Sequence, residues 1–86
     1  MAWRIEYGTQ AVKDLEHLDK PVRKRVVAYL HAVSLLDDPR QRGKALTGNL
    51  SGLWRYRVGQ WRVICLIDDG ALVVLALSIN NRADAY

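Results

Sequence analysis

The sequence is poor in the features that mark secreted and membrane proteins. It has one cysteine among 86 residues, so no intramolecular disulfide can form. Cys65 lies in the apolar run 63–67, where we expect a buried, unreactive thiol rather than a nucleophile or a metal ligand. No apolar run reaches the ~20 residues that cross a bilayer, and no signal peptide is recognised. These absences predict a cytoplasmic protein without a membrane role.

Clusters of metal ligands are also missing, because no His, Cys and Asp residues stand at metal-ligand spacing. The two histidines, His17 and His31, are the usual candidates for acid–base chemistry near neutral pH. Both fall in predicted helices, on the side expected to pack, and we interpret them as surface or structural residues. The sequence therefore predicts no metal and no other cofactor.

Acidic residues are absent from one continuous third of the chain. Between Pro39 and Ile67 there is no Asp or Glu, whereas the remainder has seven basic and nine acidic residues, a net charge of −2. All of the excess positive charge thus lies in one segment, which indicates a polyanionic partner. A solvated basic surface is the alternative. The basic residues of the segment are Arg40, Arg42, Lys44, Arg55, Arg57 and Arg62.

The first half of the chain has the pattern of a strand followed by two helices, and 86 residues fit a single domain, 1–86. Residues 3–7 alternate as a short strand. Thr9 is a suitable N-cap for a first helix, and Pro21 suits the first turn of a second helix that runs to about Leu36. So short a connection predicts an antiparallel helix hairpin. The apolar positions are Ala11, Leu15 and Leu18, then Val22, Val26, Leu30, Val33 and Leu36.

The second half has the pattern of three strands. Residues 53–58 and 61–67 flank Gly59-Gln60, which suits a type II′ hairpin turn. Asp69-Gly70 predicts a second turn, followed by a strand over 71–79. The fold class is therefore α+β, with a three-stranded antiparallel sheet packed on both helices.

The first hairpin places three arginines on one face of the sheet. Its turn sets Val58 opposite Trp61 and Arg57 opposite Arg62, with Arg55 opposite Ile64. Like charges directly opposite each other are destabilising, whereas a phosphate would relieve them, and arginine suits bidentate phosphate contacts. Acids from elsewhere, such as Asp68 and Asp69, are the alternative source of neutralisation. The other face of the hairpin, expected to meet the helices, has Trp54, Tyr56, Val58, Trp61, Val63 and Cys65.

The C-terminal tail adds two candidates for a site on this face. Arg82 follows the last predicted strand, and Tyr86 supplies a ring able to stack on a base, worth about 1–3 kcal/mol. The alternative for a terminal tyrosine is a frayed end without function.

Together these residues resemble the RelE family, within the RelE/ParE superfamily of type II toxin–antitoxin toxins. The resemblance covers nearly the whole chain. Its most specific parts are Leu53-Trp54-Arg55-Tyr56-Arg57, then Trp61-Arg62-Val63, and Arg82 four residues before Tyr86. It implies a microbial-ribonuclease-like fold, ribosome-dependent cleavage of mRNA in the A site, and neutralisation by a cognate antitoxin.

The resemblance also implies roles for single residues. Arg55 and Arg57 fall beside the attacking 2′-hydroxyl and the scissile phosphate, and Arg62 falls at the phosphate clamp. Arg82 falls near the leaving 5′-oxygen, and Tyr86 at the tyrosine that stacks on the base. We expect the remaining basic residues of the segment, Arg40, Arg42 and Lys44, to contact RNA or the ribosome.

Two departures from the family pattern keep other functions open. Some members have lysines in place of Arg55 and Arg57, and arginine stays protonated, so no general base is identified. Asn80 replaces a frequent glycine, and Ala83 a basic residue, which is compatible with weakened catalysis. The alternatives are a gyrase-inhibiting toxin of the ParE branch without nuclease activity, and an RNA- or antitoxin-binding module that has lost catalysis.

Overall fold

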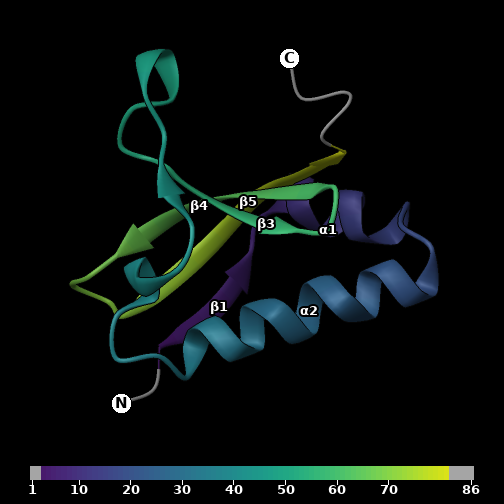
Figure 1. The fold of residues 1–86 in the computed structure, drawn as a ribbon, viewed down its shortest axis with the longest axis horizontal. Coiled ribbons are helices and arrows are strands. Elements are labelled where there is room, and N and C mark those ends of the chain that lie inside the picture. Colours follow the sequence, from purple (N-terminus) through teal and green to yellow (C-terminus); the bar gives the residue numbers. More distant parts are fainter. Residues whose placement is uncertain (1–2, 82–86) are drawn as a thin grey trace.

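The computed structural model describes residues 3–81, which form an α+β fold with helices on one face of a mixed sheet (Figure 1). Arg82 and Tyr86, the two predicted site residues of the tail, lie outside the described residues. The elements, in chain order, are β1 (Arg4–Tyr7), α1 (Thr9–Glu16), α2 (Lys20–Ser34), η1 (Pro39–Gln41), β2 (Lys44–Ala45), η2 (Gly48–Leu50), β3 (Trp54–Val58), β4 (Trp61–Asp68) and β5 (Val73–Asn81).

The sheet has five strands in the order β1-β5-β4-β3-β2. The predicted antiparallel sheet is wrong at β1, which pairs parallel to β5, with Arg4 opposite Val73 and Tyr7 opposite Ala76. Parallel strands need a long crossover, and the two helices and intervening strands between β1 and β5 supply one. The sheet also gains β2, a two-residue edge strand that is too short to show a period in the sequence.

The first hairpin has the predicted register. Val58 lies opposite Trp61 and Arg57 opposite Arg62, with Arg55 opposite Ile64. Gly59 has φ 61°, as the first residue of a type II′ turn requires. The register therefore follows from local turn chemistry.

The second turn is longer than predicted. Asp68 pairs with Val73, so four residues form the loop and β5 begins at Val73 rather than at residue 71. The Asp68 carboxylate accepts a hydrogen bond from the Ala71 N–H at 3.1 Å, and Leu72, not glycine, has the positive φ of 55°. A side chain that caps its own loop is what makes this wider turn stable.

The helix boundaries differ from the prediction by one or two residues. Gly8, not Thr9, is the N-cap of α1, because the Gly8 N–H still donates to the Ala76 carbonyl of the sheet at 2.8 Å. Pro21 lies in the first turn of α2 as predicted, and α2 ends at Ser34 rather than near Leu36. The N–H groups of Leu35 and Leu36 donate to carbonyls three residues back, which closes the helix.

The core lies between the helices and one face of the sheet. α1 packs chiefly on β5, and α2 reaches from β1 to β3, so both helices contact the sheet more than each other. The Asp14 carboxylate accepts a hydrogen bond from the Ile79 N–H at 2.8 Å and ties α1 to β5 beyond the end of β1. The fully buried residues include Ala11, Val26, Leu30, Val33, Tyr56, Val63, Cys65, Val74 and Ala76.

Cys65 is buried as predicted, and burial raises the pKa of its thiol to about 12. The thiol is therefore protonated at neutral pH. Among residues 3–81, no helix combines the length and the apolar character needed to span a bilayer.

Candidate functional site

The face of the sheet away from the helices gathers basic side chains from three strands. Residues directly opposite each other in an antiparallel sheet share a face. One row across this face pairs Lys44 of β2 with Arg55, and the next pairs Arg57 with Arg62. We call these four residues the basic row. Lys44 joins it only because β2 forms, which the sequence pattern did not predict.

A pocket of about 310 Å³ lies on this face, next to the basic row. Arg62 is its only charged lining residue among those described, and it is 8% exposed. A break in register between Ile64 and Cys65 leaves Leu77 without a partner in β4, so that β5 contributes both Leu77 and Ser78 to the lining. The pocket is lined by Leu50, Leu53, Arg62, Ile64, Leu77, Ser78 and Asn80.

The electrostatics of this face favour an anion. The Arg55 side chain is half-buried, and within residues 3–81 its buried Nε has no hydrogen-bond partner. A buried donor without a partner costs about 1–3 kcal/mol. Arg57, opposite the buried Arg62, is exposed. An anion held here would offer acceptors to a planar guanidinium and offset the repulsion between opposed cations.

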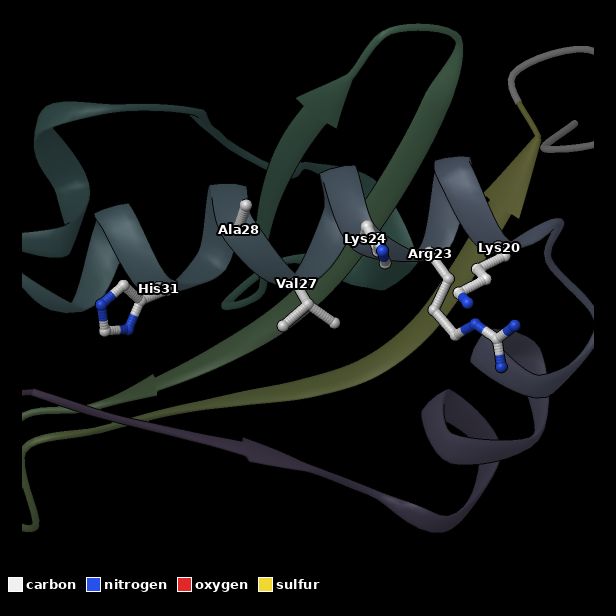
Figure 2. A pocket seen from close by; sticks show the side chains of 6 residues that line it. All are labelled: Lys20, Arg23, Lys24, Val27, Ala28 and His31. Carbon is white, nitrogen blue, oxygen red and sulfur yellow. The ribbon is translucent and has the colours of Figure 1, made fainter.

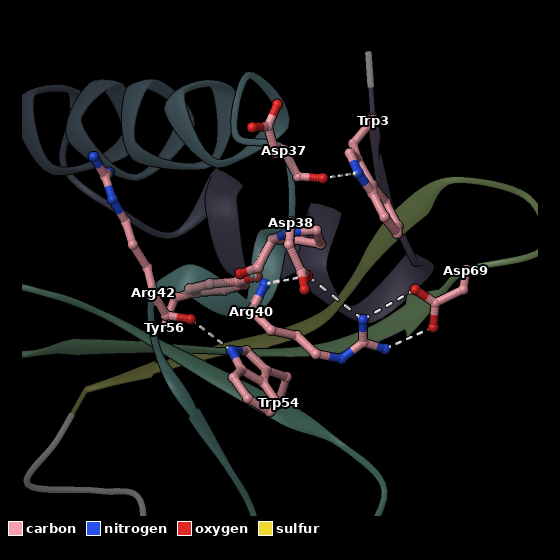
Figure 3. Close-up of polar contacts among 9 residues, drawn as sticks. Trp3, Asp37, Asp38, Arg40, Arg42, Trp54, Tyr56 and Asp69 are labelled. Carbon is pink, nitrogen blue, oxygen red and sulfur yellow. Dashed lines mark hydrogen bonds and ion pairs between the residues drawn. The ribbon is translucent and has the colours of Figure 1, made fainter. Parts of the chain in front are cut away.

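Asp68 and Asp69 do not neutralise this cluster through the bonds they form. They lie at the far end of β4, where Asp68 caps the loop. Asp69 accepts two hydrogen bonds from Arg40, at 3.0 and 2.7 Å (Figure 3). Hydrogen bonding to Arg40 lowers the pKa of the Asp69 carboxyl, although that carboxyl is exposed. The predicted alternative for these two acids is therefore wrong.

The other residues predicted to contact RNA or the ribosome are in three different situations. Arg40 is engaged with Asp69 and, at 3.6 Å, with Asp38. The Arg42 guanidinium lies over the Tyr29 ring, 5.6 Å from its centroid, while the Arg42 carbonyl accepts a hydrogen bond from Trp54 at 2.8 Å (Figure 3). Lys44 alone of the three lies in the basic row.

The segment that leads into β2 is fastened to the hairpin from below. The buried Tyr56 hydroxyl donates a hydrogen bond to the Pro39 carbonyl at 2.7 Å, and burial raises the pKa of Tyr56. Gly43 has φ 81°, and a Cβ there would overlap the Arg55 carbonyl oxygen and lie 2.7 Å from Trp54 Nε1. These contacts set where Lys44 meets Arg55.

A second, more open pocket of about 610 Å³ lies on the outer side of α2 (Figure 2). Lys20, Arg23 and Lys24 line one end of it and His31 the other. His17 lies elsewhere, where its Nδ1 is 2.7 Å from the Lys13 carbonyl. Neither histidine lines the pocket beside the basic row. In residues 3–81, no three His, Cys, Asp or Glu side chains are grouped so as to hold a metal ion.

Known proteins resemble this chain over its whole length. Residues 5–86 match the family described as the ParE toxin of type II toxin-antitoxin system, parDE. The chain is 31% identical to toxin RelG of Mycobacterium tuberculosis, covering 100% of this chain and 98% of the relative. It is 34% identical to toxin RelE of the same organism, covering 98% and 86% respectively.

Solved structures agree with this result. The M. tuberculosis RelBE2 toxin–antitoxin complex contains a chain that matches with a TM-score of 0.86 and 29% identity, covering 98% of this chain and 95% of that chain. The RelE–RelB complex of Pyrococcus horikoshii matches with a TM-score of 0.75 and 28% identity, covering 99% and 100%. The isolated Escherichia coli RelE toxin, at 22% identity and a TM-score of 0.76, shares the fold, with 93% and 84% covered.

Proposed function

We propose that this chain, which belongs to the RelE/ParE family of toxins from type II toxin–antitoxin systems, is an endoribonuclease that cleaves mRNA on the ribosome. The observation that carries the proposal is the basic row beside a pocket on the open face of the sheet. Four cations from separate strands converge there, on the side that no helix covers. A polyanion is the partner that such a face suits.

The reaction proposed is attack of an RNA 2′-hydroxyl on the adjacent phosphate. It forms a 2′,3′-cyclic phosphate and expels the 5′-oxygen of the next nucleotide, which leaves as a 5′-hydroxyl. Arg62 would clamp the phosphate, and Arg55 and Arg57 would stabilise the charge that develops on its oxygens. By the family resemblance, Arg82 would act at the leaving oxygen and Tyr86 would stack on the base. No step of this reaction requires a metal ion or a cofactor.

The cellular context of the proposal follows from the family. Relatives were crystallised with RelB antitoxins, and we infer a cognate antitoxin for this chain as well. Its mRNA substrate places it in the cytoplasm, which agrees with the buried thiol of Cys65. Lys44 and Arg42 would add contacts to RNA or the ribosome. Arg40 would do so only at the expense of its ion pair with Asp69.

The test is 5′-end mapping of an mRNA translated in a purified system to which the protein is added. The expected result is new 5′-hydroxyl ends within codons, lost in Arg62→Ala and strongly reduced in Arg57→Ala and Arg82→Ala. Arg23→Ala is the matched control, because it removes an arginine from the outer side of α2, away from the basic row. Equal cleavage by Arg62→Ala and the wild-type protein would exclude the assigned roles.

A second function is favoured by one observation, namely that the matching family is described as a ParE toxin. That branch poisons DNA gyrase and does not need the arginine set. Inhibition of gyrase supercoiling without any cleavage of translated mRNA would support it. Tight, steeply salt-dependent RNA binding without cleavage would instead indicate the catalytically weakened form that Asn80 and Ala83 suggest.

A further inference from the structure

The pocket beside the basic row has an apolar wall that phosphate binding alone does not explain. Leucines 50 and 53 lie before β3, Ile64 lies on β4, and Leu77 is the extra residue of the bulge in β5. A phosphate site needs donors and charge, whereas apolar side chains are what hold the faces of a nucleobase. The volume of about 310 Å³ lies at the lower end of small-ligand sites, which begin at about 300 Å³.

The polar end of the pocket has the groups that read a base edge. Asn80 lies opposite Arg62 in the register. Its Nδ2 is 3.4 Å from Ser78 Oγ, to which it donates. This contact orients the amide and leaves Oδ1 as an acceptor together with the second N–H as a donor. An acceptor next to a donor is complementary to adenine, whose N6 donates and whose N7 accepts, whereas guanine presents two acceptors on the same edge.

We propose that this pocket is a nucleobase site selective for adenine, in which Asn80 and Ser78 read the base edge and the four apolar side chains hold its faces. The inference rests on the proposed function, since it assigns a base preference to the same RNA substrate. Arg62, across the strand pair from Asn80, places the phosphate of the bound nucleotide beside the base. The bulge in β5 is what aligns Leu77 and Ser78 for this purpose.

Binding of mononucleotides measures the preference without any cleavage. The purified protein, labelled with ¹⁵N, is titrated with the 3′-monophosphates of adenosine, guanosine, cytidine and uridine while its amide resonances are followed. We expect adenosine to bind about fivefold tighter than the others, the lower end of what one good base contact contributes. The largest shifts should be those of Ile64, Ser78 and Asn80.

Three variants separate reading of the base from folding and stacking. Asn80→Ala should lose the preference for adenosine while retaining affinity for all four nucleotides, and its thermal unfolding should match the wild type. Leu50→Ala should weaken all four nucleotides to a similar degree and keep their ranking. Gln60→Ala, in the exposed turn of the same hairpin and outside the pocket, is the matched control and should change neither.

The outcomes distinguish this inference from the proposed function. An unchanged nucleotide ranking in Asn80→Ala, or shifts that fall on the outer side of α2 instead, would overturn the adenine site. Cleavage maps of translated mRNA should lose an enrichment for adenine in Asn80→Ala, while total cleavage remains. Selective adenosine binding by a protein that never cuts mRNA would retain the base site and refute the ribonuclease proposal.

Discussion

Removing the Tyr56 hydroxyl should reveal how the segment before β2 is held. Tyr56 is fully buried and donates to the carbonyl of the buried Pro39 at 2.7 Å. Burial raises its pKa, so the hydroxyl stays protonated and remains a donor at neutral pH. Tyr56→Phe keeps the ring and leaves the Pro39 carbonyl without this donor. Such a loss costs about 1–3 kcal/mol, which corresponds to roughly 4–8 °C of Tm for each kcal/mol in a chain of this size.

The assay is urea unfolding at neutral pH, followed by tryptophan fluorescence and by circular dichroism. Tyr29→Phe is the matched control, because the Tyr29 ring packs 5.9 Å from that of Tyr56 and its hydroxyl makes no hydrogen bond within residues 3–81. The control should change the free energy of unfolding by less than about 0.5 kcal/mol. Similar losses in the two variants, or no loss in Tyr56→Phe, would refute the role of this hydrogen bond.

Three further predictions concern Gly43, Cys65 and Asp69. Gly43→Ala should lower the free energy of unfolding by about 1–3 kcal/mol more than Gly48→Ala, since both have positive φ but only Gly43 lacks room for a Cβ; equal losses in denaturant titrations would contradict this. Cys65, with a pKa of about 12, should react with a thiol-specific disulfide reagent only when the protein is unfolded by urea. Asp69→Asn should lower the urea midpoint at neutral pH. Because Arg40 depresses the Asp69 pKa below its unfolded value, the two proteins should converge as pH falls through that lowered pKa.

Local chemistry explains the parts of the fold that were predicted correctly. The Gly59-Gln60 turn determines the register of its hairpin within a few residues, and alternation then assigns Arg55, Arg57 and Arg62 to the open face. The apolar stripe of α2 is likewise a property of one helix, and its central residues are buried as expected. In each case the interaction that decides the structure lies within one element or one turn.

The errors lie where contacts join distant parts of the chain. The parallel pairing of β1 with β5 connects residues about 70 positions apart, and no pattern within either strand distinguishes it from antiparallel pairing. Arg40 was assigned to RNA from charge alone, whereas its partner Asp69 lies 29 residues away. Lys44 enters the basic row through β2, and Ser78 enters the pocket next to a bulge that β5 does not announce in its sequence.

The open face supplies charge but no proton acceptor suited to neutral pH. Among residues 3–81, the basic row and the pocket lining consist of arginines, one lysine, apolar side chains, Ser78 and Asn80. Arginine stays protonated at any working pH, and both histidines lie away from the pocket. Under the proposed function, these residues bind the phosphate, stabilise its developing charge and orient the base. Removal of the 2′-hydroxyl proton therefore falls to groups outside this set, which is the physical reason to expect activity on the ribosome rather than on free RNA.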